Sequence, residues 1–117
     1  MLFRSAHAVR DCRDALSATG TRIERLMGVG GGTNSEIWVE ILATALDTPI
    51  DLPEAGDFGA ATGAARLAMM AATGAGAEIA TRPPVARTIA PRADLVDAFS
   101  EAHERYRAAY AAIRDLH

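Results

Sequence analysis

Three consecutive glycines, residues 30–32, separate an apolar run from a helical pattern in the stretch LMGVGGGTNSEIWVEILATAL. Glycine loses more conformational entropy on ordering than any other residue. It also reaches dihedral angles closed to other residues and allows a close approach to the main chain. We therefore expect these glycines to form an ordered turn with a definite structural or binding role.

The residues around the glycines predict a strand before the turn and a helix after it. Residues 23–29 are mostly apolar and predict the strand. Asn34 or Ser35 supplies a side-chain oxygen for the helix N-cap. Beyond the cap, apolar residues recur at steps of three and four, which predicts a helix: Trp38, Ile41, Leu42, Ala45 and Leu46.

This strand, turn and helix allow two interpretations. A helix N-terminus attracts anions, because its free N–H groups and its dipole point to one spot, so phosphate or a nucleotide would fit there. The alternative is a tight turn that only lets the helix pack closely on the strand. The dinucleotide fingerprint G-x-G-x-x-G does not fit, because Thr33 stands at its third glycine.

Elsewhere the pattern predicts further helices and one more strand. Residues 6–18 predict an amphipathic helix that presents Val9, Cys12 and Leu16 on one face, with Cys12 buried. Residues 48–53, TPIDLP, are extended and predict a short strand. We expect another helix from Asp57, its cap, to about Thr73.

The last third of the chain predicts an irregular connection and a closing helix. Residues 74–92 hold several glycines and prolines, and we expect Ile79, Val85 and Ile89 to pin this segment down. The closing helix carries an apolar stripe at steps of three and four: Leu95, Phe99, Ala102, Tyr106, Ala109 (or Tyr110) and Ile113. The chain has the length of a single domain. Its alanine-rich composition favours helix.

Composition excludes several functions. All 12 basic residues are arginine, so a Walker A loop and lysine-based catalysis are excluded for this chain. A net charge of −3 without a basic run argues against nucleic acid as a partner. The single cysteine cannot form an internal disulfide, which fits a cytoplasmic setting. The most apolar stretch is interrupted by Arg66, so we expect no membrane span.

Residue spacing predicts no catalytic or metal site within this chain. The carboxylate pairs lie on solvated helix faces and favour structural roles: Asp11 with Asp14, Glu36 with Glu40, and Glu101 with Glu104. The three histidines lack ligand spacing: His7, His103 and His117. Gly59 and Gly63 stand four residues apart, and we expect them to bring their helix close to a neighbouring backbone.

Three ordered blocks carry a family resemblance: GVGGGTNSEIWVEILATAL, PEAGDFGAATGAARLA and AHERYRAAYAAIRDL. Together they resemble the C-terminal end of FGGY carbohydrate kinases, most closely the xylulose kinases. The glycines, with Ser35 and Trp38 beyond them, are similar to the adenosine loop of these enzymes. Thr62 stands where the family more usually has a larger aliphatic residue in its alanine-glycine helix.

The resemblance implies the C-terminal part of an actin-like, ribonuclease-H-like α/β lobe, helix-rich with a short strand pair. It implies that Gly31 and Gly32 approach ATP through their backbone, while Asn34 and Ser35 line its ribose or adenine side. It also implies that the sugar site, the general base and most of the Mg²⁺ binding lie in a lobe outside this chain. We therefore expect no catalytic residue here and an inactive isolated chain.

Two functions remain open. The first is the nucleotide side of a cytoplasmic kinase that converts D-xylulose to D-xylulose 5-phosphate. Within this class, an FGGY kinase for glycerol, ribulose or gluconate is the alternative. The second is a noncatalytic nucleotide-binding or dimerisation module. The full-length enzyme could form a homodimer.

Residues 1–5, MLFRS, do not continue the pattern of the helix that follows. Leu-Phe-Arg-Ser is also what the end of a common sequencing adapter encodes in one reading frame. We expect residues 1–5 to be a non-native leader and residues 6–117 to be the C-terminal nucleotide-side portion. The alternative is a genuine helix start with Ser5 as its N-cap.

Overall fold

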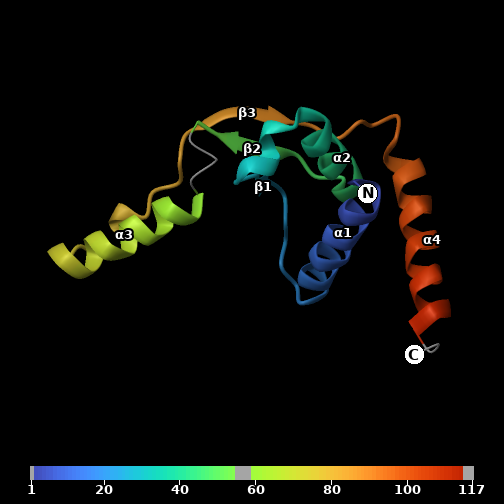
Figure 1. Cartoon of the computed structure of the whole chain (residues 1–117), viewed down its shortest axis with the longest axis horizontal. Helices are drawn as coiled ribbons and strands as arrows, with labels where there is room; N and C mark the ends of the chain where they lie inside the picture. The colour runs from blue at the N-terminus through green and yellow to red at the C-terminus, as the bar shows by residue number, and fades with distance from the viewer. Residues whose placement is uncertain (1, 55–58, 115–117) are drawn as a thin grey trace.

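The computed structural model describes residues 2–54 and 59–114. Its extents are 54 × 34 × 27 Å, and α3 and α4 lie at opposite ends of the long axis (Figure 1). The elements follow in this order: α1 (Leu2–Ala18), β1 (Leu26–Met27), the 3₁₀ turn η1 (Gly31–Asn34), α2 (Glu36–Leu46), β2 (Ile50–Pro53), α3 (Gly59–Thr73), the 3₁₀ turn η3 (Ala77–Ile79), β3 (Val85–Ile89) and α4 (Val96–Arg114).

The three strands form one sheet in the order β1-β2-β3. Strand β1 pairs with β2 in parallel, and β2 pairs with β3 antiparallel. Parallel neighbours need a crossover connection, and α2 provides it. Successive strand residues point to opposite faces, so Ile50 and Leu52 of β2 pack with Val39 and Ala43 of α2, while Asp51 points to the other face. The core therefore lies between α2 and the sheet.

The connection from α2 to β2 is short. Asp47 ends the helix in the left-handed conformation, with φ 43°, and its N–H donates to the carbonyl of Thr44 at 3.2 Å. The Thr48 hydroxyl, which is buried, donates to the carbonyl of Leu46 at 2.8 Å. These bonds satisfy the last carbonyls of the helix and set the point at which β2 begins.

Helix α1 differs from the prediction in its start and in its buried face. It begins at Leu2 rather than residue 6, and its buried residues are Ala6 and His7. Cys12 is exposed, and so are Val9 and Leu16, so the predicted buried face was wrong. The physical reason is that α1 contacts both α2 and α4, and a small alanine lets helices approach closely where a larger side chain would hold them apart.

The strands also differ from the prediction. The strand expected over residues 23–29 is limited to Leu26–Met27, although the Gly28 N–H still donates to the Asp51 carbonyl at 2.8 Å. Strand β3 lies inside residues 74–92, which were predicted to be irregular. The structure therefore has a three-stranded sheet where the sequence predicted only a pair of strands. The residues of β3 form a strand because they pair with β2 along one edge, a contact that the sequence pattern does not reveal.

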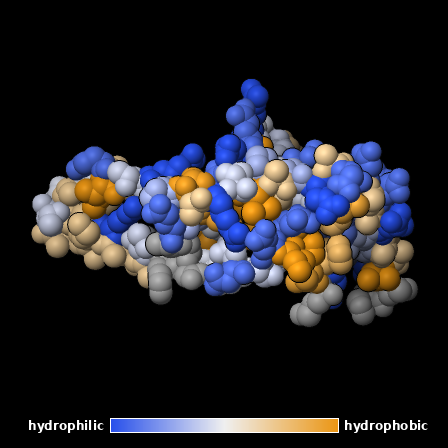
Figure 2. Space-filling view, turned by 90° about the horizontal axis from the view of Figure 1, so that it is seen from above, coloured by the Kyte–Doolittle hydropathy of each residue, from blue (hydrophilic) through white to orange (hydrophobic). Residues whose placement is uncertain are grey.

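Helix α3 agrees with the predicted helix, but none of its residues is buried. Leu67 is 68% exposed, and many residues at the α3 end of Figure 2, on the left, are coloured as hydrophobic. A Cβ at Gly59 would lie 3.0 Å from Cβ of Val29, so the helix approaches a neighbouring side chain there rather than the expected backbone, whereas a Cβ at Gly63 would face open space. The expected cap, Asp57, lies outside the described residues.

Helix α4 confirms the predicted closing helix, and it lies beside α1 and α2. Its buried residue is His103, and the ring of Phe99 lies 5.6 Å from that of Phe3 between centroids. Towards the C-terminus, Tyr110 and Ile113 are exposed. Among the described helices, none combines the length and apolarity that crossing a membrane requires.

Candidate functional site

The glycine turn joins β1 to α2 through η1. Gly30 adopts φ 95° and ψ 166°, a conformation that favours glycine, and its carbonyl accepts from the Thr33 N–H at 3.0 Å and from the Thr33 hydroxyl at 2.8 Å. The Ser35 N–H donates to the carbonyl of Gly32 at 3.3 Å. The backbone conformation of Gly30 is therefore one reason for a glycine at this point.

Ser35 is the N-cap of α2, which confirms one of the two predicted caps. Its Oγ accepts from the Trp38 N–H at 3.4 Å. Capping satisfies one of the free N–H groups at the helix start and fixes where α2 begins. The helix direction relative to the glycine turn is thereby set by a local contact.

The four residues predicted to face a nucleotide lie together on this turn: Gly31, Gly32, Asn34 and Ser35. A Cβ at Gly31 would find no heavy atom within 4 Å, so the turn presents bare backbone to open space there. A Cβ at Gly32 would lie 3.6 Å from the Trp38 ring. Residues at the start of a helical turn also have N–H groups without a partner in that turn. The turn can therefore receive a ligand on its main chain, and the four roles stay a prediction.

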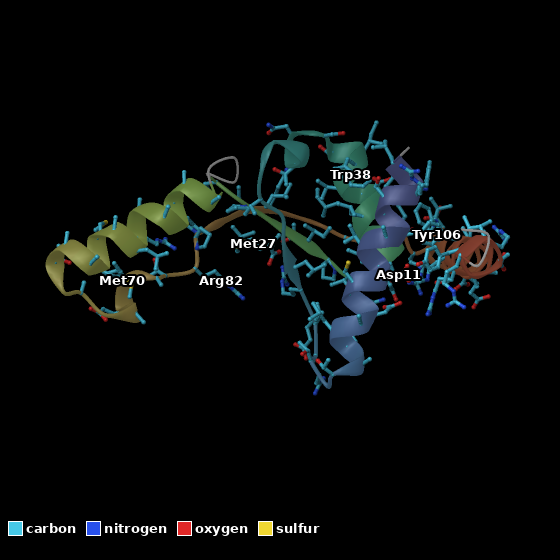
Figure 3. The ribbon with its side chains drawn as sticks, turned by 60° about the horizontal axis from the view of Figure 1, so that its bottom comes forward. Asp11, Met27, Trp38, Met70, Arg82 and Tyr106 are labelled. Carbon is cyan, nitrogen blue, oxygen red and sulfur yellow. The ribbon has the colours of Figure 1, made fainter. Side chains whose placement is uncertain are left out.

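Beneath the turn lies an apolar cavity of about 330 Å³. It opens between α1, β1 and α2, and Figure 3 shows Trp38 at the start of α2. Its walls are almost all apolar: Val9, Leu26, Met27, Gly28, Val29, Gly32, Thr33, Trp38, Val39, Leu42, Leu46 and Ile50. A Cβ at Gly31 would thus face open space, while Gly32 and Thr33 line an apolar cavity.

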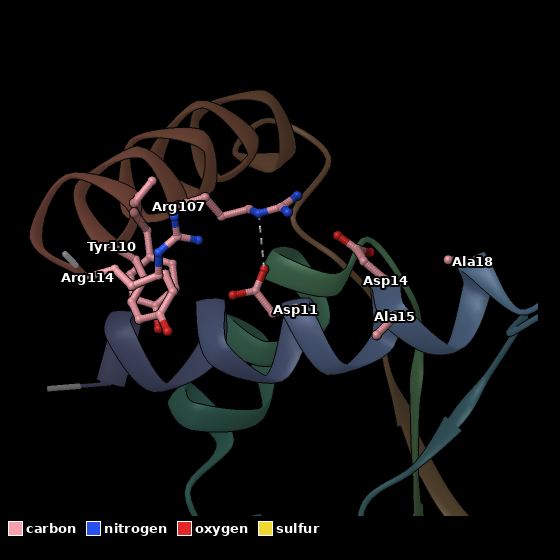
Figure 4. A pocket seen from close by; sticks show the side chains of 9 residues that line it. Asp11, Asp14, Ala15, Ala18, Arg107, Tyr110 and Arg114 are labelled. Carbon is pink, nitrogen blue, oxygen red and sulfur yellow. Dashed lines mark ion pairs between the residues drawn. The ribbon is translucent and has the colours of Figure 1, made fainter.

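A larger groove of about 640 Å³ lies between α1 and α4 (Figure 4). Asp11 and Asp14 line the α1 side, while Arg107 and Arg114 line the α4 side. The Arg107 Nε lies 3.6 Å from Asp11 Oδ1, the ion pair drawn in Figure 4. No residue of the glycine turn lines this groove, so we place the candidate nucleotide site at the turn despite the smaller cavity there.

Sequence reasoning missed a buried polar cluster at the junction of α1 and α4. His103 Nε2 lies 2.9 Å from Asp11 Oδ1, and the rings of His7 and His103 are 5.6 Å apart between centroids. Burial lowers the pKa of His7, and the nearby His103 and Arg10 lower it further. His103 and Asp11 are 92 positions apart, so spacing along the chain carries no signal of this contact.

A second polar cluster crosses the sheet on the face away from α2. The Arg25 Nε donates to Asp51 at 2.9 Å, and the Thr88 hydroxyl donates to the same carboxylate at 2.6 Å. The bond from Arg25, followed by that from Thr88, lowers the pKa of Asp51 to about 2. This cluster links three segments of the sheet, and its carboxylate is fully engaged in holding them together.

The carboxylates of Glu36 and Glu40 form ion pairs with arginines, in keeping with structural roles. Glu36 pairs with Arg87 at 2.8 Å, which ties the start of α2 to β3. Glu40 pairs with Arg92 at 3.5 Å. Within residues 2–54 and 59–114, no group of three or more His, Cys, Asp and Glu side chains could hold a metal ion.

Comparisons with known proteins agree on one family. The FGGY family of carbohydrate kinases, C-terminal domain, matches residues 2–72. A xylulose kinase from Escherichia coli K12 is 32% identical over 112 residues, which cover 94% of this chain and 23% of that protein. The chain spans about a quarter of the length of that relative.

Two crystal structures are similar to this chain. A xyloylose kinase from Brucella ovis is 51% identical, with a TM-score of 0.87 over 99% of this chain and 24% of that one. A xylulose kinase from Rhodospirillum rubrum is 26% identical, with a TM-score of 0.78 over 98% of this chain and 24% of that one.

Proposed function

The chain belongs to the FGGY family of carbohydrate kinases, and from this premise we propose that it forms the nucleotide side of an ATP-dependent D-xylulose kinase. The product of the complete enzyme would be D-xylulose 5-phosphate. The xylulose and xyloylose kinases among its relatives support this choice of sugar. The proposal also includes a cytoplasmic location, in keeping with a single cysteine, and the pairing of two enzymes into a homodimer.

The observation that carries the proposal is the open side of the glycine turn. Gly31 has no neighbour within 4 Å of a would-be Cβ, although the turn itself is tied by hydrogen bonds at Gly30 and Gly32. A turn built for packing alone would have its small residues against a neighbour, as Gly59 has against Val29. Open backbone in a tied turn fits a nucleotide, which would rest on Gly31 and Gly32.

The residues here fit a binding role rather than a chemical one. Bound ATP supplies the phosphoryl group that passes to a sugar hydroxyl. In this proposal the Gly31 and Gly32 backbone holds the nucleotide, Asn34 and Ser35 line its ribose or adenine side, and the capped start of α2 keeps them in place. Phosphoryl transfer depends mainly on positioning and electrostatic stabilisation, so correct placement of the nucleotide contributes directly to the rate.

The other requirements of the reaction fall to the rest of the enzyme. The family resemblance assigns the sugar site, the general base and the first phosphate loop to a lobe outside this chain. The described carboxylates do not gather into a metal site, so Mg²⁺ would be held mainly by that lobe. We therefore expect the isolated chain to show no ADP release above background with ATP and D-xylulose in a coupled assay.

A chimera tests the proposal directly. This chain replaces the matching 24% of the Brucella ovis enzyme, and ATP-dependent phosphorylation of D-xylulose is measured with and without Gly31→Val. Valine would occupy the open side of the turn, so we expect the KM for ATP to rise at least about tenfold, equivalent to about 1.4 kcal/mol. The KM for D-xylulose should change little.

Gly31→Ala is the graded control, because a single methyl group fills less of the same space. We expect it to raise the KM for ATP less than valine does. A folded chimera that loses ATP and sugar affinity equally with Gly31→Val would support the packing interpretation. The sugar site of the chimera belongs to the Brucella ovis enzyme, so the chimera tests the nucleotide side alone. A folded chimera that never turns over would favour the noncatalytic module.

A further inference from the structure

Trp38 contacts two of the four residues assigned to the nucleotide. Its indole edge lies beside Gly32, where a Cβ would be 3.6 Å from both Cδ1 and Nε1 of the ring. Its backbone N–H donates to the Ser35 Oγ at 3.4 Å. One residue is therefore in contact with the glycine turn through its ring and with the N-cap through its main chain.

The Trp38 ring and the glycine turn share one cavity. Trp38 lines the cavity of about 330 Å³ together with Gly32 and Thr33 on the turn side. Leu42 lines the same cavity one helical turn further along α2, and it is packed on the sheet core. The indole is thus the part of α2 that supports the underside of the turn.

A glycine turn needs such support. Three glycines offer no side chains that could anchor them, and their large backbone freedom opposes any single conformation. An indole is large and rigid, and it has few rotatable bonds to order, so it restricts a neighbouring backbone at low entropic cost. A smaller residue at position 38 would leave the underside of Gly32 facing an enlarged cavity.

We propose that Trp38 is a positioning residue for the nucleotide: its ring supports Gly32 so that the open side of the turn keeps the shape on which ATP rests. The inference rests on the proposed function, because it assigns Trp38 to the same site. Trp38 acts through Gly32 and Ser35 and has no part in the chemistry. Its loss should weaken nucleotide binding in the ground state and transition state alike, which raises the KM for ATP and leaves kcat unchanged.

The experiment compares Trp38→Ala, Trp38→Phe and Leu42→Ala in the chimera with the Brucella ovis enzyme. We expect Trp38→Ala to raise the KM for ATP by about tenfold, with kcat and the KM for D-xylulose within about twofold of the parent. Trp38→Phe keeps an aromatic ring beside Gly32 and should recover most of the affinity. Leu42→Ala removes apolar volume from the same cavity without touching the turn, and it should leave the KM for ATP unchanged.

Amide hydrogen exchange in the 117-residue chain adds a readout of the turn itself. We expect the amides of residues 31–34 to exchange faster in Trp38→Ala than in Leu42→Ala, which separates support of the turn from general loosening of α2. Equal effects of the two variants on the KM for ATP, or on exchange in the turn, would overturn the inference. If Gly31→Val raises the KM for ATP while Trp38→Ala does not, the inference fails and the proposed function stands. If neither variant affects ATP, the proposed function fails.

Discussion

Helices α2 and α3 are both predominantly apolar, yet their surroundings are opposite. Helix α2 buries five residues against α1, α4 and the sheet: Val39, Ala43, Thr44, Ala45 and Leu46. Helix α3 is longer, with 15 residues against 11, and buries none. Its one charged side chain is Arg66, so α3 leaves an apolar surface exposed at its end of the molecule (Figure 2).

The difference separates the contribution of local sequence from that of packing. Alanine and methionine favour helix intrinsically, so the α3 sequence specifies a helix without help from neighbours. Short helices are nevertheless marginal in water, and most helical stability in proteins comes from a packed apolar face. Helix α2 has such a face within these residues. We expect α3 to obtain one from the other three quarters of a complete kinase.

Truncating one leucine in each helix should give the largest difference in the free energy of unfolding. Leu46 is 2% exposed and Leu67 is 68% exposed. We expect Leu46→Ala to lower the free energy of unfolding by about 2–5 kcal/mol, through lost burial and a residual cavity. Leu67→Ala should change it by less than about 0.5 kcal/mol. Urea denaturation of the two variants measures both values.

The same two leucine substitutions can be compared in the chimera with the Brucella ovis enzyme. There, Leu67→Ala should cost more than about 1 kcal/mol if α3 is covered by the remainder of the enzyme. A cost as small as in the isolated chain would contradict that expectation. A large cost in the isolated chain would mean that α3 is already packed in solution.

A lower pH should reduce the stability of the region that packs around His7, and it should have no such effect on α3. Burial is the largest cause that holds the pKa of His7 below its usual 6.5, and in the unfolded chain that shift is lost. The unfolded state therefore takes up the proton first, and stability should decline as the pH falls below about 6.5. We expect a lower Tm at pH 5.5 than at pH 7.5, and a smaller difference in His7→Phe, which cannot titrate.

The sheet provides an internal reference for this pH dependence. The depressed pKa of Asp51 means that its stabilising effect is present above about pH 4 and is lost as the pH falls towards 2. Asp51→Asn should therefore leave the change between pH 7.5 and 5.5 unaltered. If the difference in Tm between pH 7.5 and pH 5.5 disappeared in Asp51→Asn as well as in His7→Phe, the assignment to His7 would be contradicted.

The smallest change in stability is expected for a substitution at Gly63 of α3. Its would-be Cβ faces open space, so Gly63→Ala should stabilise the isolated chain by about 0.5–1 kcal/mol by favouring helix. Gly59→Ala would press on Val29 at 3.0 Å and should gain less or lose stability. Thermal unfolding of the two variants measures the difference. Stabilisation of equal size at both glycines would show that the Val29 contact is unimportant.

Features set by neighbouring residues could be predicted from the sequence. The family and the α/β class are confirmed, and so are the helix after the glycines and its Ser35 cap. The helix and its cap depend on the spacing of apolar residues and on a hydrogen bond between near neighbours, and both can be read from a short stretch of sequence. The four residues predicted to face a nucleotide lie on one turn for the same reason, because they are consecutive or nearly so.

Features set by distant residues could not be predicted. Strand β3 depends on pairing with β2, and the exposed Cys12 depends on how α1 sits against α2 and α4. His103 meets Asp11 across 92 positions. Each of these contacts needs the tertiary arrangement. Trp38 is close to Gly32 along the chain, but the helical stripe marks it only as an apolar residue, so the place of its ring beside Gly32 was not predicted either.

The short connection through Asp47 and Thr48 restricts how this segment can change in length over evolution. Successive residues of β2 alternate between the core and the opposite face, so one inserted residue before Ile50 would turn the Asp51 carboxylate towards Val39 and move Leu52 out of the core. It would also separate Asp51 from Arg25 and Thr88. Relatives should therefore keep this connection at constant length, and insertions should accumulate instead in the exposed stretch between α3 and β3.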